Sequence, residues 1–96
     1  MKNQYMSEEM CEKALKRFGK ERQMWQLIEE FSELEKEIAK EVNGRREDLK
    51  DLTEEAADVL IMMDQLLYIY NIHDEVKAQA EYKVNRLRKY LESTEK

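Results

Sequence analysis

Two groups of acidic residues with helical spacing are the residues of this chain best suited to chemistry. Glu30 and Glu33 follow Glu29 in the pattern E-E-x-x-E, and Glu55 and Asp58 form the pattern E-x-x-D. Residues three apart lie on nearly the same side of a helix, so two antiparallel helices would bring the two pairs together. Four carboxylates that close cannot all stay ionised without a cation. Oxygen ligands without Cys or His favour Mg²⁺, with Mn²⁺ as its substitute.

In a chain with 22 acidic residues, such carboxylate pairs usually belong to a salt-bridged surface. The position of Asp58 favours a metal site instead. Asp58 leads into the least polar stretch of the chain, from Ala56 to Tyr70. An ionised carboxylate beside apolar surroundings needs a cation or a charged partner. A di-iron bundle would instead use two Glu-x-x-His motifs. The only histidine, His73, belongs to no such motif and is interpreted as a residue at a helix start.

Helices must position these carboxylates, because the composition is that of an all-α protein. The chain has no proline and only two glycines, and it lacks alternating apolar runs bounded by turn residues. Ninety-six residues make a single domain, 1–96. Its two ends, residues 1–6 and 92–96, are polar and are expected to fray.

The spacing of apolar residues predicts four helices. The first two helices are expected over residues 8–18 and 20–42. The third begins between 48 and 54 and ends near 71. The fourth opens at 73–74, with Asp74 as its cap. Ser7 has the properties of an N-cap, Gly19 those of a helix end, and Asn43-Gly44 those of a stop. Residues Met24, Leu27, Ile28, Phe31, Leu34, Ile38 and Val42 form one apolar stripe on the second helix.

The third helix has apolar residues at every angle of the helical wheel. A helix that is apolar all round must be covered on all sides, and a chain of this length cannot surround it alone. The stretch is a little short for a membrane span and contains two aspartates, which argues against a membrane protein. We therefore expect the apolar surface to be covered by further copies of the chain.

Charge and cysteine content exclude other classes of protein. The net charge of −5 argues against nucleic-acid binding, which needs a basic excess. Cys11 is the only cysteine, so no internal disulfide can form and a reducing compartment is expected. The first nine residues have no apolar core of the kind that signal peptides contain. These features together predict a cytoplasmic protein.

Three segments resemble the MazG-type all-α nucleoside triphosphate pyrophosphohydrolases. WQLIEEFSEL is followed, about twenty residues later, by EEAADVL, and the family is marked by E-E-x-x-E on one helix and E-x-x-D on the next. KVNRLR, from Lys83 to Arg88, is similar to a segment in the last helix of many members. The resemblance covers roughly residues 15 to 90. It implies a four-helix MazG-like protomer whose helices pack into a bundle across an oligomer interface, a tetramer being favoured over a dimer.

The resemblance also implies an activity. With Mg²⁺, members of the family hydrolyse a nucleoside triphosphate to the monophosphate and pyrophosphate. The substrate is an NTP or a dNTP, either canonical or non-canonical. The implied role is housecleaning, that is, removal of unwanted nucleotides from the nucleotide pool. The positions that match the family's metal ligands are Glu30, Glu33, Glu55 and Asp58. Glu29 matches the first glutamate of the motif, which orients a ligand or water, so the expected catalytic residues are Glu29, Glu30 and Glu33.

The last helix supplies the expected substrate contacts. Lys83, Asn85 and Arg86 match the segment that holds the nucleotide, and Arg88 could take the place of Arg86. A triphosphate carries about four negative charges, so Mg²⁺ must bridge it to the carboxylates, while Lys83 and an arginine neutralise the remaining charge. Glu33 or Glu30 would accept the proton of the attacking water. A solvated helix face is the alternative interpretation of the last-helix residues.

Other residues have two interpretations each. Trp25 lies off the apolar stripe of its helix, and it either packs against a neighbour or stacks on a planar ligand as a substrate-binding residue. Arg45 and Arg46 lie in a loop that is either solvated or guides an anionic ligand. For the whole chain, the main alternative is a non-enzymatic helical oligomerisation or adaptor module with structural acidic pairs. A second alternative keeps the metal but acts on another phosphate ester or anhydride.

Overall fold

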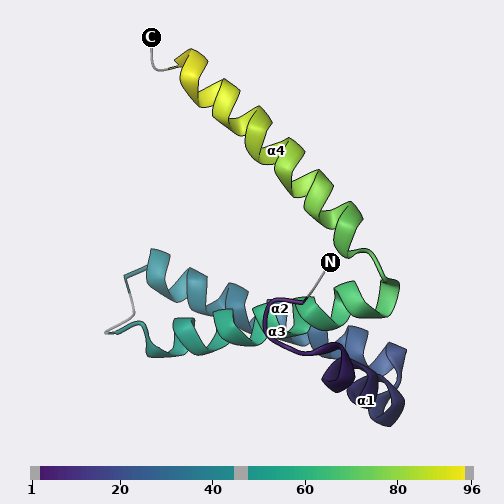
Figure 1. Ribbon diagram of the computed structural model, residues 1–96. Helices are drawn as coiled ribbons and strands as arrows, with labels where there is room; N and C mark the ends of the chain where they lie inside the picture. The colour runs from purple at the N-terminus through teal and green to yellow at the C-terminus, as the bar shows by residue number, and fades with distance from the viewer. Residues whose placement is uncertain (1–2, 45–47, 95–96) are drawn as a thin grey trace.

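Two antiparallel helices, α2 and α3, organise the chain (Figure 1). In the computed structural model, which describes residues 3–44 and 48–94, α2 spans Lys20–Val42 and α3 spans Lys50–Tyr70. Helix α1, Glu8–Phe18, packs against both of them, and α4, His73–Thr94, follows α3. Over the described residues the structure has four helices and no strand, so the predicted all-α class is confirmed.

The boundary between α1 and α2 follows the predicted local signals. The Ser7 hydroxyl accepts a hydrogen bond from the backbone N–H of Met10 at 3.1 Å, which caps α1. Acidic residues occupy the first turn of α1 and basic residues its last turn, as the helix dipole favours. Gly19 has a φ of +85°, a conformation that suits glycine, and it separates α1 from α2.

The ends of α3 also lie within the predicted limits. The Asp48 carboxylate accepts a hydrogen bond at 3.0 Å from the backbone N–H of Lys50, the first residue of α3, and Leu49 occupies the N-cap position. Asn71 adopts a left-handed φ of 54° after the last residue of α3. Helix α4 already begins at His73, so Asp74 lies in its first turn rather than at the cap, where its charge still suits the helix dipole.

The apolar core of the single chain is small. Its buried apolar residues are Cys11, Leu27 and Val59, all along the lines where α1, α2 and α3 meet. The predicted stripe of α2 is covered only in part, because α3 shields one strip of that helix and leaves the rest exposed; the exposed members are Ile28, Phe31, Ile38 and Val42. Much apolar surface of the hairpin is thus available for contact with another molecule.

Helix α4 extends away from the other three helices (Figure 1). Over the described residues it forms no interface comparable to that between α2 and α3. Its apolar residues are therefore exposed, among them Val76, Val84, Leu87 and Leu91. The overall extents of 53 × 36 × 19 Å reflect this projecting helix. None of the described helices is long and apolar enough to cross a membrane.

Residues 4–6, near the beginning of the chain, are attached to the middle of α3 by hydrogen bonds. The Asp64 carboxylate is 2% exposed, and it accepts hydrogen bonds from the backbone N–H groups of Gln4, Tyr5 and Met6 at 2.7, 2.6 and 2.9 Å. At the other end, α4 continues to Thr94, and the fraying of residues 92–96 stays a prediction. Residues 1–2 and 95–96 lie outside the described ranges.

Two further hydrogen bonds hold the same segment. The Asn3 amide nitrogen donates to the Cys11 sulfur at 3.0 Å, and the Asn3 amide oxygen lies 2.5 Å from Nε2 of His73. His73 is thus a buried residue at the start of α4, where the sequence analysis placed it. Asn3 connects α1 to the junction between α3 and α4.

Candidate metal centre

Three carboxylates meet between α2 and α3. Glu30 comes from α2, and Glu55 and Asp58 come from the first half of α3. Each of the three offers one oxygen, and these oxygens lie within 4.8 Å of one another. The antiparallel pairing of the two helices produces this convergence, because it places the middle of α2 beside the first half of α3.

The electrostatics of the cluster show negative charge without a compensating cation. Burial raises the pKa of Glu30 above its ordinary value, and the charge of Asp58, a hydrogen bond with Asp58 and the charge of Glu55 raise it further. Burial likewise raises the pKa of Glu55, followed by the charges of Asp58 and Glu33. None of the ion pairs formed by the described residues includes Glu30, Glu55 or Asp58. A cation or a proton would relieve this repulsion.

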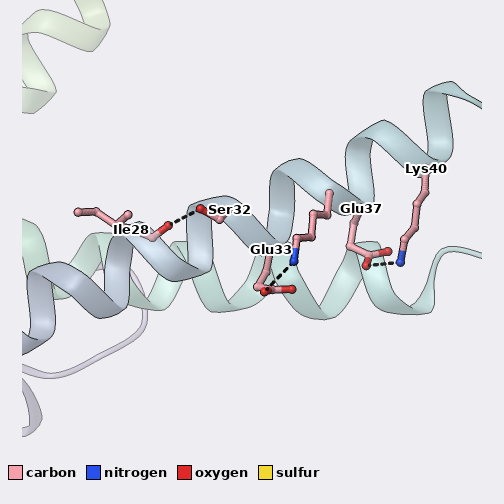
Figure 2. A network of polar contacts seen from close by, with 6 residues as sticks. Ile28, Ser32, Glu33, Glu37 and Lys40 are labelled. Atoms are coloured by element: carbon pink, nitrogen blue, oxygen red, sulfur yellow. Dashed lines mark hydrogen bonds and ion pairs between the residues drawn. The ribbon is translucent and has the colours of Figure 1, made fainter.

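A neighbouring carboxylate on α2 provides a useful contrast (Figure 2). Glu37 is only 8% exposed, and one of its oxygens lies 3.2 Å from the Lys40 ammonium group. This is the structural ion pair that the alternative interpretation of the acidic residues requires. No described lysine or arginine forms an ion pair with Glu30, Glu55 or Asp58, so the two carboxylate sites differ over the part of the chain that the structure describes.

Glu33 lies outside the group of three, although the sequence places it among the ligands. Its carboxylate is 3.6 Å from the Lys36 ammonium group, an ion pair drawn in Figure 2. The charge of Glu33 nevertheless contributes to the raised pKa of Glu55, so Glu33 interacts electrostatically with the cluster. Glu29 is exposed, and its charge makes a small contribution to the raised pKa of Glu30.

The three carboxylates fit a hard divalent cation. Carboxylate oxygens are the ligands that Mg²⁺ and Mn²⁺ prefer, and Mg²⁺ commonly binds few protein ligands and completes its shell with water and phosphate oxygens. Glu30, Glu55 and Asp58 are the residues that would hold the ion. All three side chains are partly exposed, so solvent reaches the cluster.

Within one chain, the expected substrate-binding residues of α4 are not beside the carboxylates. Lys83 and Arg86 are exposed on the projecting helix, and the Arg86 guanidinium lies 5.7 Å from the centre of the Tyr82 ring. The Asn85 amide oxygen accepts a hydrogen bond from the Arg88 guanidinium at 2.9 Å. These contacts stay within α4, so the helix needs a second molecule if its residues are to reach a metal centre.

The remaining candidates are only partly placed by the structure. Trp25 is 64% exposed and borders a shallow hollow with Phe18 and Gly19, so it does not pack into the core of its own chain. Arg45 and Arg46 lie outside the described residues.

Two buried glutamines, Gln23 on α2 and Gln65 on α3, were not expected from the sequence. Gln23 lies seven residues before Glu30, and Gln65 lies seven residues after Asp58. Seven residues are nearly two helical turns, so each glutamine shares a helix face with a carboxylate of the cluster. This spacing is the signal that could have identified them from the sequence.

Comparisons of the chain with protein-family models, with curated proteins and with solved structures each give no match. The site must therefore be interpreted from its own residues and from the order of the sequence motifs.

Proposed function

We propose that the protein is a Mg²⁺-dependent pyrophosphohydrolase that converts a nucleoside triphosphate to the monophosphate and pyrophosphate. The observation that carries this proposal is the meeting of Glu30, Glu55 and Asp58 between two antiparallel helices, with oxygens within 4.8 Å of one another. The resemblance of the E-E-x-x-E and E-x-x-D segments to MazG-type enzymes supports the same reaction. A housecleaning role in the nucleotide pool follows from that resemblance, and the single cysteine favours a reducing compartment such as the cytoplasm.

The residues of the site have distinct roles in this proposal. Glu30, Glu55 and Asp58 hold the cation. When bound, Mg²⁺ supplies positive charge that neutralises phosphate oxygens and lowers the pKa of a coordinated water. Glu33 lies at the edge of the cluster and is free of the inner group of three, which suits it to accept a proton from the attacking water. Glu29 would orient that water or the substrate.

We also propose that the active protein is a homo-oligomer, with a dimer as the minimum and a tetramer favoured. Among the described residues of one chain only three apolar residues are buried and the apolar stripe of α4 is uncovered, which is a small core for a chain of this length. Pairing of α4 with a second copy would cover this surface. It would also allow Lys83, Asn85 and Arg86 to reach the phosphates bound at a carboxylate cluster of the partner.

A product assay tests the reaction. Purified protein is incubated with a panel of canonical and modified nucleoside triphosphates, with Mg²⁺ or with EDTA, and pyrophosphate and monophosphate are quantified. We expect both products in equal amounts and only with the metal. Release of orthophosphate instead, or no metal-dependent product from a folded oligomer, would refute the proposal.

The variant Asp58→Asn separates the proposal from the adaptor alternative. The change is nearly isosteric, so in the proposed enzyme it abolishes metal-dependent hydrolysis and leaves the stability of the metal-free protein equal or raised. In an adaptor whose acidic residues form buried ion pairs, the same change would destabilise the fold by roughly 3–5 kcal/mol. Glu35→Gln, a change of the same charge at an exposed position of α2, is the matched control and should alter neither property.

A further inference from the structure

Basic residues are concentrated where α1 meets α2. Residues 13–22 contain five basic residues and one acidic residue, a net charge of +4, whereas the other 86 residues together carry −9. The segment covers the end of α1, Gly19 and the start of α2. The Lys20 ammonium group lies 4.7 Å from the centre of the Tyr70 ring at the end of α3, so three helix ends meet here (Figure 1). A positive surface on an otherwise negative chain favours an anionic ligand.

Three of these basic residues contact aromatic rings. The guanidinium groups of Arg17 and Arg22 lie 5.7 and 5.2 Å from the centre of the Phe18 ring, so both are held beside one ring. The ion pairs between described residues include neither arginine, and they do not include Lys20. An aromatic face attracts a cation but occupies none of the five N–H donors of a guanidinium group. These donors therefore stay available to an anion.

The sequence explains why these cations differ from their neighbours on α1. Lys13 and Lys16 each pair with a glutamate one turn earlier, at 3.1 and 2.9 Å. In contrast, no acidic residue stands three or four positions from Lys20 or Arg22. Glu21 follows Arg17 by four residues, but Gly19 separates their helices. The charge of this surface is thus left without the local ion pairs that neutralise the rest of α1.

A shallow hollow of about 580 Å³ adjoins these cations, and we call it the cationic hollow. Its volume is in the range of sites that bind small molecules. Trp25 is 64% exposed and follows Arg22 by three residues, so the two side chains lie on nearly the same side of α2. Glu21 is the one acidic lining residue. The full lining set is Phe18, Gly19, Lys20, Glu21, Arg22 and Trp25.

We propose that the cationic hollow binds a nucleotide, with the phosphate held by Arg22, Lys20 and Arg17 and the base stacked on Trp25. Guanidinium groups bind phosphate oxygens in pairs, and an indole ring stacks on any base. Residues three apart on a helix have Cβ atoms about 5–6 Å apart, a separation that a ribose can span between phosphate and base. A mononucleotide is favoured over a nucleic-acid strand, because the negative charge of the remaining chain repels further phosphates.

The cationic hollow is separate from the candidate metal centre. Glu30, Glu55 and Asp58 are not among its lining residues. The hollow can bind a phosphate directly, whereas the carboxylates need a cation between themselves and a phosphate. It is therefore a second nucleotide site, which goes beyond the proposed reaction and does not depend on it.

The fluorescence of Trp25 tests this site, because Trp25 is the only tryptophan of the chain. The full chain is titrated in EDTA with adenosine monophosphate, with adenosine and with a short single-stranded oligoadenylate. We expect saturable quenching by the monophosphate, about ten-fold weaker binding of adenosine, and an affinity for the monophosphate that falls with salt. No quenching, equal affinities of monophosphate and adenosine, or no effect of salt would overturn the proposal. Tighter binding of the oligoadenylate would assign the surface to nucleic acid and would also overturn it.

Three variants locate the effect. Arg22→Gln removes the cation nearest to Trp25 and should weaken binding of the monophosphate about ten-fold, with a smaller salt dependence. Lys77→Gln makes the same change of charge at an exposed position of α4 and should bind as the wild type does. Asp58→Asn should also leave binding in EDTA unchanged, and an altered affinity would place the nucleotide at the carboxylate cluster instead. If Arg22→Gln changes the oligomer in sedimentation velocity, the hollow belongs to a subunit interface and the proposal is wrong.

Discussion

Replacement of Glu30 by glutamine should stabilise the metal-free protein at neutral pH. Burial and the neighbouring Asp58 and Glu55 carboxylates raise the pKa of Glu30 above its ordinary value of 4.5. The folded state therefore favours protonated Glu30. The stabilising effect of that proton is complete below the unfolded pKa and is lost as the pH rises through the folded pKa. Glutamine resembles the protonated side chain at every pH and can still donate a hydrogen bond to Asp58.

The size of the effect follows from the separation within the cluster. At 4.8 Å, the upper limit of the separations within the cluster, two unit charges repel by about 0.9 kcal/mol in water and by about 3.5 kcal/mol at an effective dielectric constant of 20. Glu30 and Asp58 are both partly exposed, so solvent screening places their repulsion near the lower value. We therefore expect Glu30→Gln to raise the free energy of unfolding by about 1 kcal/mol at pH 7 and by clearly less near pH 4.5.

Urea denaturation followed by circular dichroism, in EDTA and at one protein concentration, measures this difference between pH 4.5 and pH 7.5. Glu35→Gln on the exposed side of α2 is the control and should follow the wild type throughout. Addition of Mg²⁺ should reverse the order at pH 7, because only the wild type keeps all three ligands. A loss of stability in metal-free Glu30→Gln at pH 7, or a change that does not depend on pH, would show that Glu30 is a structural partner and would refute this account.

Three further results are expected. Leu87→Glu, which adds charge to the exposed apolar stripe of α4, should shift the protein to smaller species in sedimentation velocity, whereas Lys89→Glu beside it should not. Asp64→Ala removes the acceptor of three backbone N–H groups and should cost roughly 1.5–3 kcal/mol or more, with faster hydrogen exchange at Tyr5 and Met6; unchanged exchange would contradict the described contacts. Cys11 is fully buried, and burial raises the pKa of its thiol, so alkylation at pH 7.5 should be much slower in the folded protein than in urea.

The sequence was most informative about features that depend on neighbouring residues. Ser7, Gly19 and Asn43 mark helix boundaries through their own hydrogen bonds and dihedral angles, so these boundaries were predicted to within a residue. The meeting of Glu30 with Glu55 and Asp58 was also anticipated, because a short loop between two helices makes them antiparallel and fixed spacing then places the carboxylates. The metal, the reaction and the oligomer stay predictions.

Features that depend on distant contacts were not predicted. The apolar stripe of α2 suggested a core, yet Ile28 and Phe31 are exposed, since one neighbouring helix covers only one strip. The buried positions of α2 include Gln23 and Glu37, which no hydrophobic pattern can identify. Glu33 was placed among the ligands by its motif, but its ion pair with Lys36 and its distance from the group of three depend on side-chain conformations.

The hydrogen bonds of Asp64 also determine when the beginning of the chain can become ordered. The three amides that it binds are 58 to 60 residues earlier in the sequence. During synthesis these amides leave the ribosome before Asp64, so the segment that contains them stays unattached until α3 has been made. Closing such a long loop has an entropic cost that is recovered only after α3 has folded. Attachment of residues 4–6 is therefore expected as a late step in folding, and its completion reports that the α2–α3 hairpin has already formed.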